Sequence, residues 1–304
     1  MKSLVIGFGS IGKRHSSLLK NHLGHDVTVV SKQTQLDYPV YSSLQKVPHI
    51  DQYDYYIIAT ETHLHFEQLS FLNNAVRDKF ILVEKPLFMT PNSIKNNQNH
   101  IFVGYNLRFH PLLMYLKNVL STEKILCMDV VAGYYLPEWR KTDYRQSYSA
   151  ESEKGGGVLY DLSHEIDYLQ WISGEIVQTH SIQAYHSDLE IKADDITIAI
   201  GKTTKNVLFM LHIDYISKIK IRTCLVHTNK ATYWADLIQG TLRKKHRGLP
   251  EEVLSWDQQE KNATYLAMHT SILKQEKNAC TFDEGIKTLE TIQKMQSHDG
   301  DPLS

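Results

Sequence analysis

Three glycines near the N-terminus, Gly7, Gly9 and Gly12, constrain the fold more than any other feature of this sequence. They follow an apolar run at residues 3–7 and precede a helical pattern at residues 15–23. In such a unit the first glycine permits a tight turn, the second lets backbone approach a pyrophosphate, and the third lets helix and strand pack closely. The helix amides then face the phosphates. The turn predicts a nicotinamide-dinucleotide site with contacts from Gly7, Gly9, Ser10, Ile11 and Gly12.

Four more short apolar runs follow, at residues 27–30, 55–59, 80–83 and 101–103, separated by polar or helical stretches. Buried parallel strands joined by helical crossovers produce this alternation. We therefore expect an N-terminal Rossmann domain with a doubly wound parallel sheet over residues 1–106. Residues 90–100 are rich in Asn and Gln and poorly amphipathic, which predicts a trimmed edge.

The pattern changes after about residue 120, because the later apolar residues alternate with polar ones. Residues Ile196, Ile198 and Ile200 face one way, and the segment 219–222 alternates similarly. This pattern predicts strands with one buried and one polar face.

The connections 203–206 and 217–218 are short enough for hairpins. Residues 107–304 are thus expected to form an α+β domain for substrate binding and oligomerisation, with a mainly antiparallel open sheet. A final amphipathic helix over residues 282–295 is expected to pack back on the body.

Composition limits the classes of binding partner that the protein is expected to have. Lys plus Arg number 33 against 34 for Asp plus Glu, so no net field attracts nucleic acid or an anionic membrane. No apolar run approaches the roughly 20 residues of a membrane span. The three cysteines are widely spaced, as in a reduced cytoplasmic protein. The 16 histidines are scattered, and the closest pair, His63 and His65, would face apart on a helix, so no metal site is predicted.

The end of the second strand indicates the cofactor type. An enzyme selective for NAD places Asp or Glu there for the ribose 2′-hydroxyl. Here the chain reads Ser31-Lys32, a hydroxyl and an ammonium that suit a 2′-phosphate. The sequence therefore favours NADP, with NAD as the alternative and Lys32 as an ordinary surface lysine in that case.

Four further segments complete a pattern that spans most of the chain. They are residues 59–63 (ATETH), 84–86 (EKP), 104–111 (GYNLRFHP) and 155–167 (GGGVLYDLSHEID). In this order they resemble the family of glucose-fructose oxidoreductase, inositol dehydrogenase and rhizopine-catabolism oxidoreductases. The resemblance implies a two-domain, NAD(P)-dependent oxidoreductase acting on a sugar, a cyclitol or a derivative.

The resemblance also implies roles for single residues. It places Lys85 beside nicotinamide and substrate, makes Lys85-Pro86 a candidate cis peptide, and assigns Asp161 and His164 to the catalytic set. Thr60 and Glu84 join Lys85 among the expected cofactor contacts.

Alcohol oxidation independently requires this kind of chemistry. A base must take the hydroxyl proton while hydride leaves, and histidine titrates in the right range. An ammonium beside the oxygen stabilises developing negative charge. Helical spacing puts Asp161, His164, Glu165 and Tyr168 on one face, which is either one wall of a catalytic cleft or the solvated side of a surface helix.

Two departures from the family pattern bear on the site. Asp161 and His164 are three positions apart, whereas most relatives have four, which leaves the role of the aspartate open. Glu61 stands where proline commonly follows Thr60, which affects the loop near the nicotinamide.

Aromatic and guanidinium groups suit a polyhydroxylated or anionic ring. Such groups are concentrated in the segment 134–145, which resembles a subgroup of the family associated with bacterial surface-sugar pathways. The alternative is that these aromatic side chains simply pack a junction between domains. The expected substrate contacts are Asn106, Arg108, Trp139, Arg140, Tyr144 and Arg145.

The sequence thus predicts hydride transfer between a nicotinamide cofactor and a sugar-derived alcohol or carbonyl. Two alternatives remain open: a redox-neutral epimerase or lyase with a tightly bound cofactor, and a cofactor-sensing protein without turnover. The open sheet and the resemblance predict a homo-oligomer, either a dimer or a tetramer.

Overall fold

The computed structural model describes residues 1–95, 98–139, 142–256 and 262–297. The chain forms two compact units, one of Met1–Asn106 with Lys261–Leu289 and one of Leu107–Glu260 with Glu290–Ser304. Residues 261–289, which the sequence analysis placed with the second domain, thus group with the first unit. The division falls inside the last helix, α7 (Phe282–Gln296), which buries Leu289, Ile292 and Met295.

The first unit contains a seven-stranded sheet in the order β15-β6-β5-β4-β1-β2-β3. All its pairings are parallel except that of β15 with β6. Five of its strands are the predicted ones, and their Val, Ile and Leu side chains are almost wholly buried, as expected for a parallel sheet between helices. The strands are β1 (Lys2–Ile6), β2 (Asp26–Val30), β3 (Val40–Tyr41), β4 (Tyr55–Ile58), β5 (Phe80–Val83), β6 (His100–Val103) and β15 (Cys280–Thr281).

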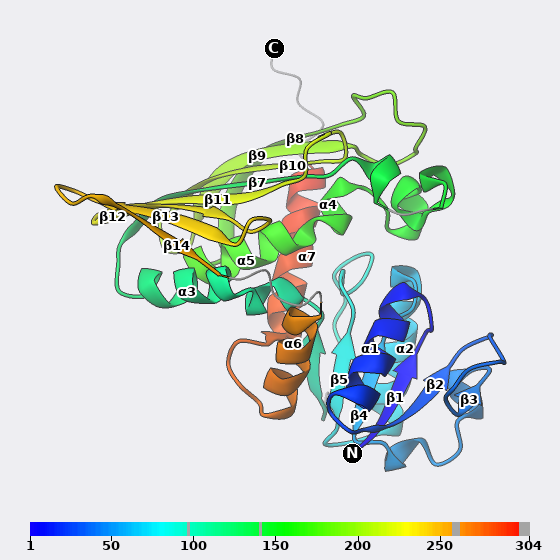
Figure 1. Ribbon diagram of the computed structural model, residues 1–304. Coiled ribbons are helices and arrows are strands. Elements are labelled where there is room, and N and C mark those ends of the chain that lie inside the picture. The colour runs from blue at the N-terminus through cyan, green and yellow to red at the C-terminus, as the bar shows by residue number, and fades with distance from the viewer. Residues whose placement is uncertain (96–97, 140–141, 257–261, 298–304) are drawn as a thin grey trace. The chain divides into compact units, whose positions relative to one another are not determined.

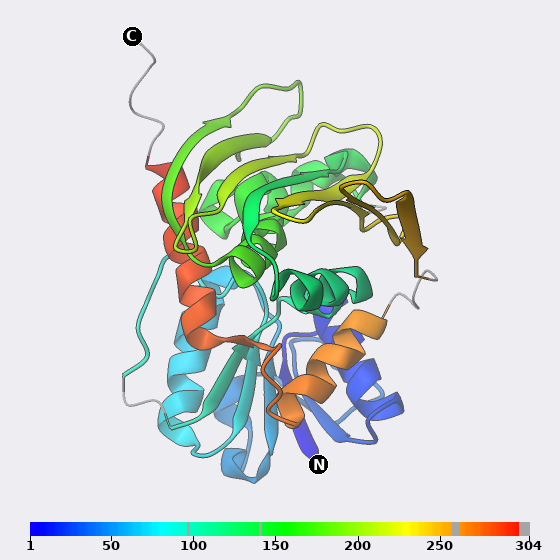
Figure 2. The ribbon, with the colours of Figure 1, turned by 90° about the vertical axis from the view of Figure 1, so that its left-hand side faces the viewer.

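Helices α1 (Ser10–Asn21) and α6 (Ala263–Leu273) lie side by side on one face of this sheet, with α2 (Thr62–Ala75) on the other (Figure 2). Leu18 and Leu19 anchor α1 in the core. Between β5 and β6 the described residues contain no helix, in agreement with the expected trimmed edge. Two 3-10 turns, Leu44–Lys46 and Ile50–Gln52, lead into β4.

The second unit contains an eight-stranded sheet in the order β14-β13-β12-β11-β7-β10-β9-β8. Its pairings are antiparallel except for β7 with β10. The two sheets confirm the predicted fold class. The strands are β7 (Ile125–Gly133), β8 (Ile176–Ala184), β9 (Ile196–Thr203), β10 (Leu208–Asp214), β11 (Ile221–Thr228), β12 (Ala231–Asp236), β13 (Thr241–His246) and β14 (Glu251–Ser255).

Two expectations about this sheet were wrong. The hairpin at 203–206 forms, but residues 217–218 do not close one, because β7 lies between β10 and β11. The isoleucines of β9 face outward, with Ile198 42% and Ile200 56% exposed, whereas Thr197 and Ala199 are buried. Small side chains line the covered side, where helices approach the sheet.

Helices α3 (Pro111–Leu120), α4 (Val158–Asp161) and α5 (Ser163–Ser173) lie on that covered side (Figure 1). α5 is buried nearly all round, including Glu165, Asp167 and Tyr168, which excludes the alternative that this helix has a solvated polar face. Short 3-10 turns connect these elements, at Asn106–Phe109, Leu136–Glu138, Tyr144–Gln146, Tyr148–Ala150 and Ser152–Lys154. Within the described ranges, no helix is both long and apolar enough to cross a bilayer.

Candidate functional site

The glycine turn has the geometry that a dinucleotide requires. Gly7 has a φ of +96°, and a Cβ there would lie 2.5 Å from the carbonyl oxygen of Ala59. A Cβ on Gly12 would lie 2.1 Å from the carbonyl oxygen of Gly7. Gly9 differs, because a Cβ there would meet nothing within 4 Å. Packing within the protein therefore does not require glycine at position 9, and the open space beside it suits the close approach of a ligand.

Helix α1 begins directly after this turn. Gly9 occupies the N-cap without a side-chain hydrogen bond, and the first turn carries no acidic residue. Ser10 is exposed and Ile11 half-buried. The amides at this end therefore face an uncapped position, which suits a pyrophosphate.

A cavity of about 510 Å³ opens beside the turn. Apolar groups line one part of it and hydroxyl, amide and ammonium groups another, with Glu67 as the carboxylate among them. A flat base and a polar ribose phosphate need this combination. The lining residues are Ile6, Gly7, Phe8, Val30, Ser31, Lys32, Gln33, Ser42, Ser43, Leu44, Gln45, Thr60, Leu64, Glu67, Gln68 and Phe71.

Several expected cofactor residues therefore line one cavity. Ser31, whose Oγ accepts from the amide of Gln33 at 3.0 Å, sits beside the exposed Lys32 at the end of β2. Ser42 and Ser43 also line the cavity, and the sequence analysis missed them. They follow β3, a two-residue strand too short for its periodicity to be recognised.

The loop after β5 carries Lys85. The Lys85–Pro86 peptide is cis, as the family resemblance implied. Lys85 is half-buried, and Glu84 is buried, with one carboxylate oxygen accepting from the Lys85 amide at 3.2 Å.

His65 is a residue of this region whose role the sequence did not reveal. It is 1% exposed, whereas His63 is exposed. Its Nδ1 lies 3.2 Å from the carbonyl oxygens of Pro86 and Leu87, and its Nε2 lies 3.2 Å from that of Thr60. Burial lowers the pKa of His65, and these carbonyl contacts oppose the shift. The imidazole thus ties the Thr60 loop to the Lys85 loop.

In the second unit, Asp161 ends α4 and is 4% exposed. Its Oδ2 accepts a hydrogen bond from the hydroxyl of Tyr215 at 2.7 Å. Leu162 interrupts the helix, so His164 belongs to α5 and is half-buried. The expected single helix through both residues is therefore two helices, because Leu162 leaves helical geometry at φ −97° and ψ 26°.

Arg108 forms a buried ion pair in the second unit. Its guanidinium makes a bidentate pair with Asp167, with distances of 2.9 Å from Nε and 2.7 Å from Nη2, and both side chains are 2% exposed. Breaking such a buried pair leaves an uncompensated charge. The guanidinium is thus engaged inside the core, and contact between Arg108 and substrate stays a prediction.

The segment 134–145 presents aromatic rings. Trp139 packs edge-on against Tyr134 and Tyr215, with centroids 5.8 and 5.2 Å away. In the described part of the chain, its buried Nε1 has no hydrogen-bond partner. Such a donor suits a ligand oxygen.

The other expected substrate residues have varied surroundings. Tyr144 accepts at its hydroxyl from the amide of Glu190 at 3.3 Å. Arg145 is exposed and pairs with Asp143 and Glu190, so its charge is already balanced. In the first unit, Asn106 donates to Thr264 Oγ1 at 2.7 Å. Arg140 lies outside the described residues.

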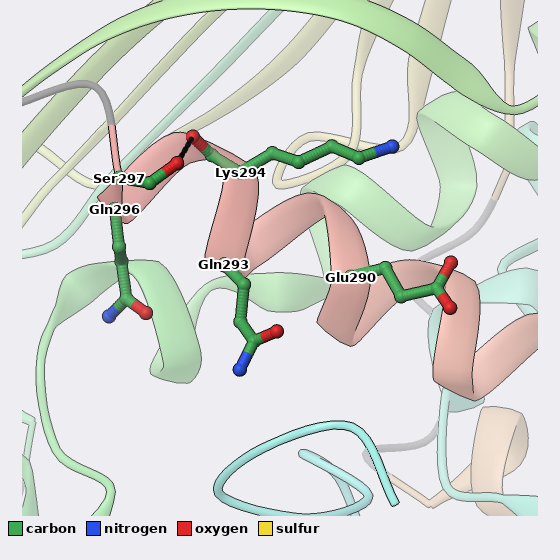
Figure 3. A pocket seen from close by; sticks show the side chains of 5 residues that line it. All are labelled: Glu290, Gln293, Lys294, Gln296 and Ser297. Carbon is green, nitrogen blue, oxygen red and sulfur yellow. Dashed lines mark hydrogen bonds between the residues drawn. The ribbon is translucent and has the colours of Figure 1, made fainter.

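A second hollow, of about 620 Å³, lies along α7. Its lining residues come from the last part of this helix and from Ser297, which follows it, and Figure 3 shows the side chains of Gln293 and Glu290 pointing in different directions. These side chains do not converge on one point, so the hollow lacks the arrangement of a chemical site.

Comparison with known proteins places the chain. An uncharacterized oxidoreductase of Streptococcus pneumoniae serotype 4 is 23% identical over 193 residues, which are 58% of this chain and 51% of that protein. The match thus spans about half the length of that relative.

Solved structures share the fold over nearly the whole chain. A UDP-N-acetylglucosamine 3-dehydrogenase from Acidithiobacillus ferrooxidans has a TM-score of 0.80 at 17% identity, with 98% of this chain and 97% of the other covered. Levoglucosan dehydrogenase in complex with NADH has a TM-score of 0.85 at 14% identity, with 98% and 96% covered. An Agrobacterium radiobacter oxidoreductase with bound NAD⁺ has a TM-score of 0.83 at 12% identity, with 99% and 96% covered.

Two family models match the chain itself. Residues 1–101 match the oxidoreductase family, NAD-binding Rossmann fold, and residues 129–300 match the oxidoreductase family, C-terminal alpha/beta domain. The chain therefore belongs to the glucose-fructose oxidoreductase, inositol dehydrogenase and rhizopine-catabolism family of oxidoreductases.

Proposed function

We propose that this protein is an NADP-preferring dehydrogenase or reductase acting on the secondary alcohol, or the corresponding carbonyl, of a sugar derivative. The observation that carries the proposal is the cavity beside the glycine turn, which combines an open Gly9, an uncapped helix end and a polar rim at Ser31 and Lys32. Family membership supports the reaction class. The dehydrogenases of UDP-N-acetylglucosamine and levoglucosan with the same fold support the substrate class.

The residues of the turn and cavity would hold the cofactor. The α1 amides and Gly9 suit the pyrophosphate, and the apolar lining around Phe8 and Leu44 suits the adenine. Lys32, Ser31, Ser42 and Ser43 would surround a 2′-phosphate with donors, while the family pattern assigns Lys85, Glu84 and Thr60 to the nicotinamide end. When bound, the nicotinamide ring supplies the hydride acceptor or donor.

The chain's own groups would handle the proton and the charge. His164 accepts the hydroxyl proton as general base in the oxidative direction and returns it in the reductive direction. The Lys85 ammonium stabilises the negative charge that develops on the same oxygen. Asp161, whose Oδ2 is held by Tyr215, orients a substrate hydroxyl or the imidazole. Trp139, Tyr144, Arg145 and Asn106 are proposed substrate contacts.

We also propose that the protein forms a homo-oligomer through the outer face of its eight-stranded sheet. Ile182 pairs across the strands with Ile198, and Ile200 with Met210, and their exposed fractions run from 39% to 63%. A contiguous apolar surface on a sheet face suits a second copy, since such patches usually mark contacts.

The direct test is an absorbance screen for reduced nicotinamide. Both cofactors are offered with free, phosphorylated and nucleotide-linked sugars. We expect substrate-dependent reduction with kcat/KM at least about tenfold higher for NADP⁺ than for NAD⁺. Product formation without net reduction would show a redox-neutral reaction instead, and cofactor binding with no reaction across the panel would contradict the proposal.

A further inference from the structure

Four buried side chains in the first unit form a continuous line of hydrogen bonds that ends beside Lys85. The Tyr55 hydroxyl lies 2.9 Å from His269 Nδ1, and His269 Nε2 lies 2.8 Å from His15 Nδ1. His15 Nε2 lies 2.9 Å from Glu84 Oε1. The four residues come from β4, α6, α1 and the end of β5, and all are at most 7% exposed.

The second carboxylate oxygen of Glu84 contacts the backbone of the next residue, Lys85. Oε2 accepts the amide of Lys85, so one carboxylate joins the line of side chains to the backbone of the proposed catalytic lysine. Gly104 makes room for this carboxylate, since a Cβ there would lie 2.7 Å from Glu84 Oε1. The Glu84 carboxylate thus gives a steric reason for glycine at position 104 of the family motif.

The number of protons available on each group determines which atoms donate and which accept along this line of hydrogen bonds. An ionised carboxylate only accepts, so His15 must carry a proton on Nε2, and a neutral His15 ring then accepts at Nδ1. His269 must then donate from Nε2, accept at Nδ1, and receive the Tyr55 hydroxyl. One neutral tautomer of each histidine therefore satisfies every contact, and all donors point towards Glu84. The edge of Tyr265 packs on His15, with ring centroids 5.6 Å apart.

The protonation states agree with this direction. Burial holds the pKa of His269 well below its usual range, so its ring is neutral. Burial also raises the pKa of Tyr55, so its hydroxyl keeps its proton. Because Tyr55 is 0% exposed, the line has no exit to water at that end and cannot serve to release a proton.

We infer that Tyr55, His269 and His15 are positioning residues that hold the Glu84 carboxylate through a one-way series of hydrogen bonds and thereby fix the backbone of Lys85. The consequence for turnover rests on the proposed function, whereas the hydrogen-bond order does not. Since His15 lies one turn beyond Gly12 on α1, the same series connects the pyrophosphate-binding helix to the Lys85 loop.

The first test is the tautomeric state of the histidines, measured by ¹⁵N NMR on the uniformly labelled full chain. We expect His15 and His269 each to carry a proton on Nε2 and none on Nδ1. His25, which contacts Ser3 Oγ at 2.7 Å outside the series, serves as an internal reference. A doubly protonated ring, or a proton on Nδ1 of either histidine, would overturn the inference.

Glu84→Gln then reverses the direction. The new amide must place its NH₂ group either against His15 or against the Lys85 amide. In the first case both histidines switch to Nδ1–H, and in the second the Lys85 amide loses its acceptor and exchanges faster with solvent. Either change supports the inference, provided that the His25 signals stay constant. Unchanged tautomers together with unchanged Lys85 exchange would overturn it.

Turnover tests the consequence. His269→Leu removes the donor to His15, whereas the amide of His269→Gln can still supply one. We expect kcat to fall roughly tenfold or more in the leucine variant and to recover to within about threefold in the glutamine variant, at unchanged cofactor affinity. His25→Gln, at another buried histidine, should match the wild type. Equal kcat in both His269 variants would overturn the positioning role. If Lys85→Met retained wild-type turnover, the proposed function would be contradicted, whereas the NMR result would still hold.

Discussion

The carbonyl oxygen of Gly7 lies so close to Gly12 that a Cβ at position 12 would come within 2.1 Å of it. Gly12→Ala should therefore lower the free energy of unfolding by about 2 kcal/mol or more, because the backbone itself must move. Gly9→Ala has open space and an ordinary φ of −72°, so its stability should change by less than about 1 kcal/mol.

Cofactor binding should separate these glycines in a second way. The Gly9→Ala methyl group would occupy the space we assign to the pyrophosphate, so its affinity for NADPH should fall at least about tenfold. Asn21→Ala, at the exposed C-terminal end of the same helix, serves as the control. Denaturant unfolding and fluorescence titration measure the two effects. A Gly9→Ala protein with full affinity would place the pyrophosphate elsewhere.

Lys32 should determine the preference between the two cofactors. Lys32→Ala is expected to weaken NADPH binding about tenfold while leaving NADH binding within about twofold, since only NADPH carries the 2′-phosphate. Lys46→Ala removes an equal charge from an exposed position that does not line the cavity. Equal losses for both cofactors would assign Lys32 a general electrostatic role.

Asp194 should make stability depend on pH. Burial raises the pKa of this carboxyl from its usual value of 3.8 to about 6. A carboxyl with a raised folded-state pKa binds more protons in the native state, so stability is greatest below about pH 4 and falls as pH rises to about 6. The contribution is at most roughly 3 kcal/mol.

Asp194→Asn should flatten that part of the stability profile. Its amide oxygen can still accept from the Leu159 amide, the contact that Asp194 Oδ2 makes at 3.1 Å. Urea unfolding at a series of pH values measures the slope. An Asp194→Asn profile parallel to the wild type between pH 4 and pH 6 would rule out this source of the dependence.

The outer sheet face should control the oligomeric state. Ile200→Lys places a charge in the centre of the apolar surface and is expected to shift the protein towards monomers in analytical ultracentrifugation. Ile219→Lys makes the same change at a 77% exposed position outside the strands and should leave the oligomer intact. A wild-type protein that is monomeric at micromolar concentration would contradict the proposal.

Much of the first unit was predictable because its buried parallel strands are short, continuous apolar runs. The glycine turn, the five main strands and the crossover without a helix in its described part all follow from local patterns. The two-residue strands β3 and β15 carry too little periodicity to be predicted. Ser42 and Ser43 were missed for the same reason, since β3 brings them to the cavity.

The second unit was harder to predict, because the alternation of apolar and polar residues along a strand does not show which face of the sheet the helices cover. The isoleucines of β9 face outward and small residues face the helices, while Arg222 pairs with the buried Glu165 at 2.8 Å. Arg108 likewise has a buried partner 59 positions away in the chain. Such long-range ion pairs leave no local pattern, so sequence reasoning assigned Arg108 to the substrate.

The most direct test of the central claim is hydride transfer by Lys85→Met, with the sugar identified in the screen. We expect cofactor affinity within about threefold of wild type and a kcat at least about 100-fold lower, because the oxygen loses its stabilising charge. Lys46→Met is the matched control and should retain full turnover. A Lys85→Met protein with wild-type kcat would contradict the account.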